Sequence, residues 1–319
     1  MKRKLKILIL IKPFWRTLAK HKSKFDMIKA FEEFADVMYW YKDENIVDIL
    51  KYMLKKHNFK PDFILHYDNS HTSFSPKISG LSDINIPKGL IIVDIYWPVN
   101  KKIKAQFIIK NKIDLVFSAT KEAFLNVFPE FKEKFRWLPF SINPNIYKDR
   151  NLNKDIDYLL MGLIDFPSKG TYPFREVVLK EMKKEKGFVH HAHPGHLIGY
   201  AENSIVNEKY ALELNRSKIF FTCGSKYHYP VLKYFEAPAC KTLLLAEPNK
   251  DILELGFEDN VNFISCNKTD LYEKAKYYIK NDNIREKISI NGYKFIHTYH
   301  TNRVRALQFI EFVEKYLKG

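Results

Sequence analysis

The chain has 319 residues, which is more than one hydrophobic core usually fills, so we expect two domains of about 150 residues each. Its 53 Lys and Arg residues outnumber 37 Asp and Glu residues, and the formal net charge of +16 favours anionic partners: nucleotide sugars, anionic polymers, nucleic acid or an acidic membrane face. No run approaches the roughly 20 apolar residues of a membrane span, which leaves only peripheral membrane contact.

In the first half, apolar runs of strand length alternate with stretches of helical periodicity. We expect strands at 4–12, 37–40, 62–67, 89–95 and 114–118, and helices at 24–35, 45–57 and 121–128. This alternation predicts a parallel sheet with helices on both faces, and therefore a doubly wound, Rossmann-like domain over 1–150. The opening apolar run, 7–11, is shorter than the about 7 to 15 residues of an export signal, so we predict a buried first strand.

Carboxylates at the ends of these strands are the candidates for general-base chemistry. Asp94 closes an apolar strand and precedes Tyr96 and Trp97, an environment that would raise its pKa and offer rings to a sugar. Asp94 is therefore the predicted catalytic base, and the alternative is that it caps a following helix. Asp68, in HYDNSH, is the other carboxylate candidate for this role, and His66 and His71 are weaker candidates.

A linker separates the two halves. Residues 136–150, RWLPFSINPNIYKDR, contain two prolines and three asparagines and predict a domain boundary near Asn151. The alternation then resumes, with strands expected at 157–163, 188–191, 218–223, 242–246 and 262–266, and helices at 172–184, 206–215, 230–239 and 271–279. We predict a second doubly wound domain over 151–301, and a last helix within 302–319 that crosses back to the first domain.

The second half carries cations where a phosphate would bind. After its first strand, GLIDFPSKGTYPFR combines Gly162 and Gly170, which permit a tight loop, with the cations Lys169 and Arg175. A helix that begins just after such a loop offers free N–H groups to a diphosphate, and an arginine can clamp it. The alternative is an ordinary loop followed by a surface arginine.

The most informative stretch is YPVLKYFEAPACKTLLLAEP, residues 229–248. Glu236 can accept hydrogen bonds from two ribose hydroxyls, and Lys233 lies three residues earlier on the same helical face. A surface ion pair is the alternative. The stretch also contains Cys240, which with Cys223 and Cys266 makes three cysteines without a CxxC pair, so we expect reduced thiols and a cytoplasmic protein.

Four histidines gather in FVHHAHPGH, at positions 190, 191, 193 and 196. No cysteine or glutamate stands at metal-ligand spacing and HExxH is absent, so we predict no metal site and choose His193, at the exit of a strand, as a ligand contact.

The sequence also lacks GxSxG, Walker and GxGxxG motifs, which excludes the hydrolases, P-loop enzymes and dehydrogenases that depend on them.

These second-half motifs resemble those of GT-B glycosyltransferases, and most closely the CgeB-type, spore-maturation-protein-like group 1 family. The resemblance covers residues 156–309 in short blocks: GLIDFPSKGTYPFR, HPG at 193–195, YALELNRSKIFFT at 210–222, KYFEAPACKTLLLAEP at 233–248, LGFEDNVNFI at 255–264 and HTYHTNRVRALQF at 297–309. It implies a GT-B fold, with two Rossmann-like domains facing each other across a cleft.

The resemblance also implies roles for individual residues. Glu236 would hold the ribose, and Lys233 and Arg175 would hold the diphosphate. The loop from Ser225 to Tyr229 would lie against the phosphates or the transferred sugar. Two positions depart from the family pattern: His228 stands where many retaining relatives carry the first glutamate of a Glu-x7-Glu pair, and Lys241 replaces a usual glycine. The stereochemical outcome is therefore open.

The sequence therefore predicts a metal-independent glycosyltransferase that needs no separate cofactor and uses a nucleotide-diphosphate sugar, with UDP-sugars favoured. The acceptor, a protein, polysaccharide or wall polymer, would bind the first domain. Three alternatives stay open: glycosylation of DNA or another anionic polymer, a sugar-nucleotide 2-epimerase, and a non-catalytic nucleic-acid or surface-binding protein on a GT-B scaffold.

Overall fold

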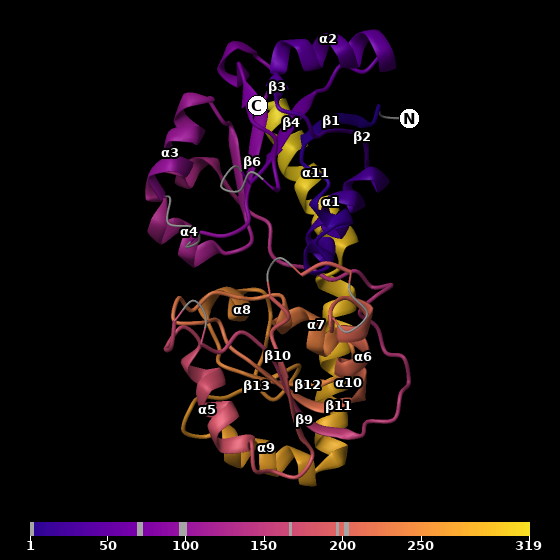
Figure 1. The fold of residues 1–319 in the computed structure, drawn as a ribbon, viewed down its shortest axis with the longest axis vertical. Helices are drawn as coiled ribbons and strands as arrows, with labels where there is room; N and C mark the ends of the chain where they lie inside the picture. Colours follow the sequence, from indigo (N-terminus) through magenta and orange to yellow (C-terminus); the bar gives the residue numbers. More distant parts are fainter. Residues whose placement is uncertain (1–2, 69–72, 96–100, 166–167, 196–197, 201–203) are drawn as a thin grey trace. The chain divides into compact units, whose positions relative to one another are not determined.

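A computed structural model describes residues 3–68, 73–95, 101–165, 168–195, 198–200 and 204–319. The chain forms two compact units (Figure 1). Unit 1 comprises Met1–Thr17, Lys24–Pro139 and Arg303–Gly319, and unit 2 comprises Leu18–Ser23 and Phe140–Asn302. A compact unit need not fold by itself, so the predicted domain boundaries at 150 and 301 stay predictions. No described helix is both long and apolar enough to span a bilayer.

Unit 1 is built on a six-stranded parallel sheet in the order β2-β1-β4-β6-β7-β8. The strands are β1 (Leu5–Leu10), β2 (Ala35–Trp40), β4 (Phe63–Tyr67), β6 (Lys88–Ile92), β7 (Leu115–Ser118) and β8 (Phe135–Trp137), and β3 (Glu44–Asn45) pairs separately with β5 (Ile78–Ser79). The helices are α1 (Lys22–Lys29), α2 (Ile46–His57), α3 (Lys101–Lys110), α4 (Lys121–Val127) and α11 (Asn302–Lys318), with short 3-10 helices at Phe14–Arg16, Ala19–His21, Ala30–Glu33, Leu81–Asp83 and Pro129–Lys134.

Helices cover both faces of this sheet because its central strands are apolar on both sides. Leu8 of β1 and Ile64 of β4 pack with α2 on one face. On the other face, Phe309 of α11 packs against Phe63 and Phe117, with ring centroids 6.2 and 4.9 Å away. The neighbouring residue on β6 is Gly89, where a Cβ atom would lie 2.7 Å from the Phe63 ring. The absence of a side chain there makes room for the aromatic cluster on which the C-terminal helix docks.

Unit 2 has a five-stranded parallel sheet in the order β10-β9-β11-β12-β13. Its strands are β9 (Ile156–Gly162), β10 (Phe188–Ala192), β11 (Ser217–Thr222), β12 (Leu243–Ala246) and β13 (Ile264–Ser265). Its helices are α5 (Pro173–Met182), α6 (Glu208–Arg216), α7 (Lys233–Ala239), α8 (Lys250–Glu254), α9 (Leu271–Lys280) and α10 (Asp282–Tyr299).

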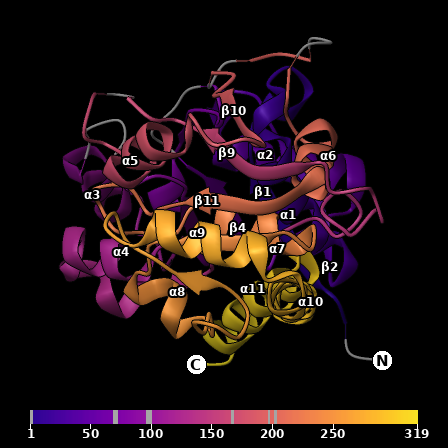
Figure 2. The same ribbon diagram turned by 90° about the horizontal axis from the view of Figure 1, so that it is seen from below.

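The two faces of this second sheet have separate cores. Tyr158 and Leu160 of β9 pack with α5 and α9, whereas Leu159 and Met161 pack with α6, α7 and α10. Alternate residues of a strand point to opposite faces, so the apolar run of β9 serves both cores. Figure 2 shows α10 end-on and α9 lying across it. The predicted α/β class with doubly wound parallel sheets is confirmed in both units.

Several element predictions were wrong. The helix expected at 24–35 ends as α1 at Lys29 and continues as a 3-10 turn into β2. Residues 135–137 form β8 inside the segment that we expected to be part of a linker, and α3 was not predicted. The helix expected at 230–239 begins only at Lys233.

Candidate functional site

The carboxyl ends of strands β9 and β10 in unit 2 border a cavity of about 100 Å³. Parallel sheets bind ligands at this edge. Its wall includes five residues whose side chains can ionise or form hydrogen bonds: Lys20, His193, Tyr210, Lys233 and Glu236. Lys233 and Glu236 come from α7, Tyr210 from α6, and His193 from the loop after β10.

Gly162, the last residue of β9, allows two cations to approach the end of this strand. Its φ angle of +139° is one that residues with a side chain rarely adopt. A Cβ atom there would lie 3.0 Å from Nη1 of Arg175 and 3.0 Å from Cε of Lys233. The absence of a side chain at Gly162 therefore lets Arg175 and Lys233 converge.

Arg175 lies in the first turn of α5 and is only 2% exposed, so the alternative of a surface arginine is wrong. Its Nη1 donates to the carbonyl of Leu163 at 3.0 Å, and its Nη2 donates to Oγ1 of Thr222 at 3.1 Å and the carbonyl of Cys223 at 3.4 Å. Its guanidinium carbon lies 4.2 Å from the centre of the Tyr172 ring.

Within the described residues, the hydrogen-bond acceptors of Arg175 are all neutral, and its buried Nε has no hydrogen-bond partner. A buried guanidinium is normally compensated by an anion. The surroundings of Arg175 therefore fit an anionic ligand rather than an internal ion pair.

Lys233 begins α7, and its Nζ lies 5.3 Å from the centre of the Tyr210 ring. Burial lowers the pKa of Lys233 to about 8, the charge of Arg175 acts in the same direction, and the charge of Glu236 opposes both. A pKa of about 8 brings the deprotonation of this lysine close to neutral pH, and a bound anion would favour its charged form.

Glu236 follows one turn later and is 5% exposed, so the alternative of an exposed surface ion pair is wrong. Burial raises its pKa, whereas Lys233, the hydroxyls of Tyr147 and Tyr210, and Lys20 act in the opposite direction. The Tyr210 hydroxyl is buried and makes no hydrogen bond of normal geometry in the part of the chain that the structure describes, although it lies close enough to Glu236 to favour the ionised carboxylate. A carboxylate next to an unsatisfied hydroxyl can bind a ligand that both donates and accepts hydrogen bonds.

His193 lines the same cavity. Its Nδ1 accepts a hydrogen bond from the Gly195 N–H group at 3.0 Å, and its Nε2 lies 2.7 Å from Nζ of Lys20. Lys20 belongs to a short segment of unit 2 that is far from the rest of the unit in sequence, and Asn207 holds it by donating to the carbonyl of Ala19 at 2.7 Å. Sequence analysis missed Lys20, although the basic run KHKSK at 20–24 was a signal.

Four of the seven predicted binding residues do not line this cavity: Arg175, which lies behind Gly162 at its edge, and Lys169, Ser225 and Tyr229. Lys169 is exposed in the loop after β9. Ser225 is buried, and its Oγ accepts from the Tyr227 N–H group at 3.2 Å, while the Tyr229 ring stacks on Tyr227. The functional roles of all seven residues stay predictions.

Unit 1 has a polar cluster at the carboxyl ends of β4 and β6. Asp68 is buried after β4 and accepts from the Val93 N–H group at 3.0 Å, and the half-buried Asp94 follows β6. Burial lowers the pKa of Lys24, while Asp94 and Asp68 raise it, so this ammonium lies near both carboxylates. The buried Lys104 donates to the main-chain carbonyl of Asp94.

Of the weaker candidates for the base, His66 is buried, and desolvation lowers its pKa to about 4, which keeps the ring neutral at pH 7. His71, Tyr96 and Trp97 lie outside the described residues, as does His196. His191 pairs with Glu213 at 2.7 Å. Among the described residues, no cluster of three or more His, Cys, Asp or Glu side chains could hold a metal ion.

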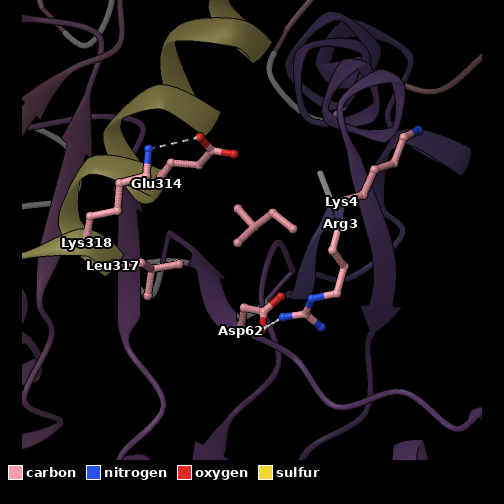
Figure 3. Close-up of a pocket in the computed structure, with 7 residues that line it drawn as sticks. Arg3, Lys4, Asp62, Glu314, Leu317 and Lys318 are labelled. Carbon is pink, nitrogen blue, oxygen red and sulfur yellow. Dashed lines mark hydrogen bonds and ion pairs between the residues drawn. The ribbon is translucent and has the colours of Figure 1, made fainter. Parts of the chain in front are cut away.

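A larger hollow, of about 350 Å³, lies in unit 1 at the amino end of β1 (Figure 3). Its charged wall residues pair with each other: Arg3 bonds to Asp62 at 2.6 Å, and Lys318 lies 3.9 Å from Glu314. Arg3 is largely exposed to solvent, and exposed pairs of this kind contribute little energy. This hollow lacks the buried, converging charges of the unit 2 cavity.

Residues 175–311 match the family model described as glycosyl transferase-like. A glycosyltransferase from Rickettsia africae ESF-5 has a similar structure, with a TM-score of 0.63 and 12% identity over 100% of both chains. Residues 175–311 therefore form a glycosyl transferase-like domain. The fold is GT-B, and the predicted enzyme class is confirmed.

Two further solved structures are similar to nearly the whole of this chain. Anabaena HepE, in complex with UDP and glucose, has a TM-score of 0.62 and 12% identity over 98% of this chain and 100% of HepE. Sucrose-phosphate synthase from Thermosynechococcus elongatus has a TM-score of 0.63 and 11% identity over 99% of this chain and 100% of the synthase. No significant match to a curated protein sequence was found.

Proposed function

We propose that the glycosyltransferase takes its sugar from a nucleotide-diphosphate sugar bound in the unit 2 cavity, with a UDP-sugar as the favoured donor. The observation that carries this proposal is the convergence of Arg175 and Lys233 at Gly162. Two cations, one of them buried without an internal anion among the described residues, match the charge of a diphosphate. The complex of HepE with UDP-glucose, a protein of the same fold, supports the choice of donor.

Glu236 and Tyr210 would hold the ribose of this donor. The carboxylate accepts hydrogen bonds from the two vicinal hydroxyls, and the Tyr210 hydroxyl, which makes no hydrogen bond of normal geometry among the described residues, bonds to the ligand. Glu236 must be ionised for this role. The positive charges of Lys233 and Lys20 favour its ionised form against the cost of burial.

The reaction would need no metal ion. As the bond between the sugar and the diphosphate breaks, negative charge grows on the leaving phosphate, and Arg175 and Lys233 offset it. Lys20 and His193 on the same wall add a second polar pair that would contact the phosphate or the transferred sugar.

The acceptor, a carbohydrate or an anionic molecule, would bind unit 1, with Asp94 as the base that removes a proton from its hydroxyl. Asp68 and Lys24 lie near Asp94, so the proposed base belongs to a cluster of charged side chains at the carboxyl end of the sheet. We also propose that the chain is a relative of the CgeB-type family and that it lies in the cytoplasm. The sequence blocks at 193–195 and 233–248 and the three free cysteines support these two proposals.

Ligand-induced stabilisation in EDTA tests the proposal. A donor present at 100 times its dissociation constant adds about 2.7 kcal/mol, which raises the melting temperature by roughly 5 °C for a protein of this size. We expect a UDP-sugar to give this shift and Lys233→Met to reduce it, while Lys180→Met, an exposed control on α5, leaves it unchanged. No shift with any UDP-, dTDP- or GDP-sugar, with the wild-type protein folded, contradicts the proposal.

A further inference from the structure

Helix α3 of unit 1 has apolar residues on its solvent face. Lys104 and Ile108 face inward and are buried, and Lys104 fixes the helix by its bond to the carbonyl of Asp94. On the outer side, Ile103 is 47% exposed and Ile109 is 68% exposed. Large apolar side chains exposed on the outer side of one helix can mark a contact surface. Figure 1 shows that α3 lies at the surface of unit 1.

Cations surround the two isoleucines, and acids are absent. From position 101 to 113 the sequence is KKIKAQFIIKNKI, without Asp or Glu. Four of its lysines are exposed: Lys101, Lys102, Lys110 and Lys112. We call these four lysines together with Ile103 and Ile109 the α3 surface.

We propose that the α3 surface binds the face of a bilayer that contains anionic lipids. Interfacial helices bury apolar side chains at the boundary between headgroups and acyl chains, while their lysines attract the anionic headgroups. Both halves of this chemistry are present within the ten residues of α3. Since the surface is short, it gives reversible, peripheral binding rather than stable insertion.

Charge and polarity disfavour the other occupants. A second copy of the chain meeting this face would place four lysines against four like charges, which is repulsive. A soluble polyanion would pair with the lysines but gain little from two exposed isoleucines. The apolar and cationic groups together therefore favour a lipid surface.

Exposed apolar residues elsewhere lack this setting and provide a control. Leu253 of α8 is 51% exposed, which is similar to Ile103, but its exposed neighbour in the helix is the acidic Glu254. Single exposed apolar residues of this kind are normal on protein surfaces.

Co-sedimentation with phospholipid vesicles tests the proposal. The full chain should bind vesicles of 70% phosphatidylcholine and 30% phosphatidylglycerol, and not vesicles of phosphatidylcholine alone. Ile103→Ser with Ile109→Ser, and separately Lys102→Gln with Lys110→Gln, should each weaken binding by roughly tenfold or more, whereas Leu253→Ser should leave it unchanged. All four substituted residues of the α3 surface are exposed, so the variants are expected to fold, which thermal denaturation checks.

Three results would overturn the proposal. One is a folded wild-type protein that does not bind the anionic vesicles. Another is an isoleucine double variant that binds them as tightly as the wild type while soluble heparin competes, which would indicate a polyanion site. The third is wild-type protein that ignores vesicles and forms a dimer in light scattering that the isoleucine variant loses, because a second copy would then cover the face.

Discussion

Replacing Lys233 with methionine should weaken the binding of UDP-glucose and remove its dependence on pH above about 8. The wild-type lysine has a pKa of about 8 because burial and Arg175 disfavour its charge. A bound diphosphate favours the charged form, so the protein takes up a proton on binding when the pH exceeds this value. At pH 9, about one tenth of the free protein carries the proton, and affinity should therefore be about tenfold lower than at pH 7.

The size of the effect at pH 7 follows from the loss of one charge-assisted contact, which is about 1.5 to 3 kcal/mol, or a factor of roughly 10 to 150 in affinity. Isothermal titration calorimetry between pH 7 and 9 measures both effects, and two buffers of different ionisation enthalpy report the proton uptake directly. UDP-glucose suits the assay because its diphosphate diester does not titrate in this range, and ionisation of its uracil toward pH 9 affects the wild type and Lys233→Met alike. The control Lys180→Met should follow the wild-type curve.

Parallel pH curves for the wild type and Lys233→Met would refute the reasoning, because the pH dependence would then come from another group. Equal affinities of the two proteins at pH 7 would likewise remove Lys233 from the diphosphate site.

Four more predictions follow from the same geometry. Glu236→Gln should weaken UDP-glucose binding by about 1.5 to 3 kcal/mol, which calorimetry measures; unchanged affinity would exclude the ribose role. Gly162→Ala should lower affinity by roughly tenfold or more, since its Cβ would displace Arg175 and Lys233; wild-type affinity would contradict this steric argument. Asp94→Asn should reduce kcat by a factor on the order of 100 or more with donor affinity retained, and equal turnover would remove Asp94 from catalysis. The pKa of Lys233 is about 8 in the folded protein and 10.5 in the unfolded chain, so between these pH values the unfolded chain binds the lysine proton more tightly. The free energy of unfolding should therefore rise from pH 8 to 10 more in the wild type than in Lys233→Met. Urea denaturation at each pH measures this difference.

The fold could be predicted because its signal is local. Apolar runs such as LKILIL of β1 are buried on both faces, and they alternate with helices along the whole chain. Two elements gave no such signal. The strand β8 has only three half-buried residues, and α3 is apolar on its outer side as well, so its residues show no clear 3.6-residue stripe.

The site could be predicted only where its residues lie within one motif. Lys233 and Glu236 share one turn of α7, and Arg175 follows a glycine-containing loop, so spacing alone brought them to attention. Lys20 reaches the same cavity through contacts with residues more than 170 positions away, such as His193, which spacing cannot indicate. Lys169 lies in an exposed loop outside the lining of this cavity, and the spacing of the motif does not indicate that position either.

The most direct test of the account is calorimetric titration of the wild-type protein with UDP-, dTDP- and GDP-sugars in EDTA. The account predicts saturable binding of one nucleotide sugar per chain without a metal ion, with strong loss of affinity when Arg175→Lys and Lys233→Met are combined. Absence of binding by every nucleotide sugar, or binding that persists undiminished in this double variant, would contradict it.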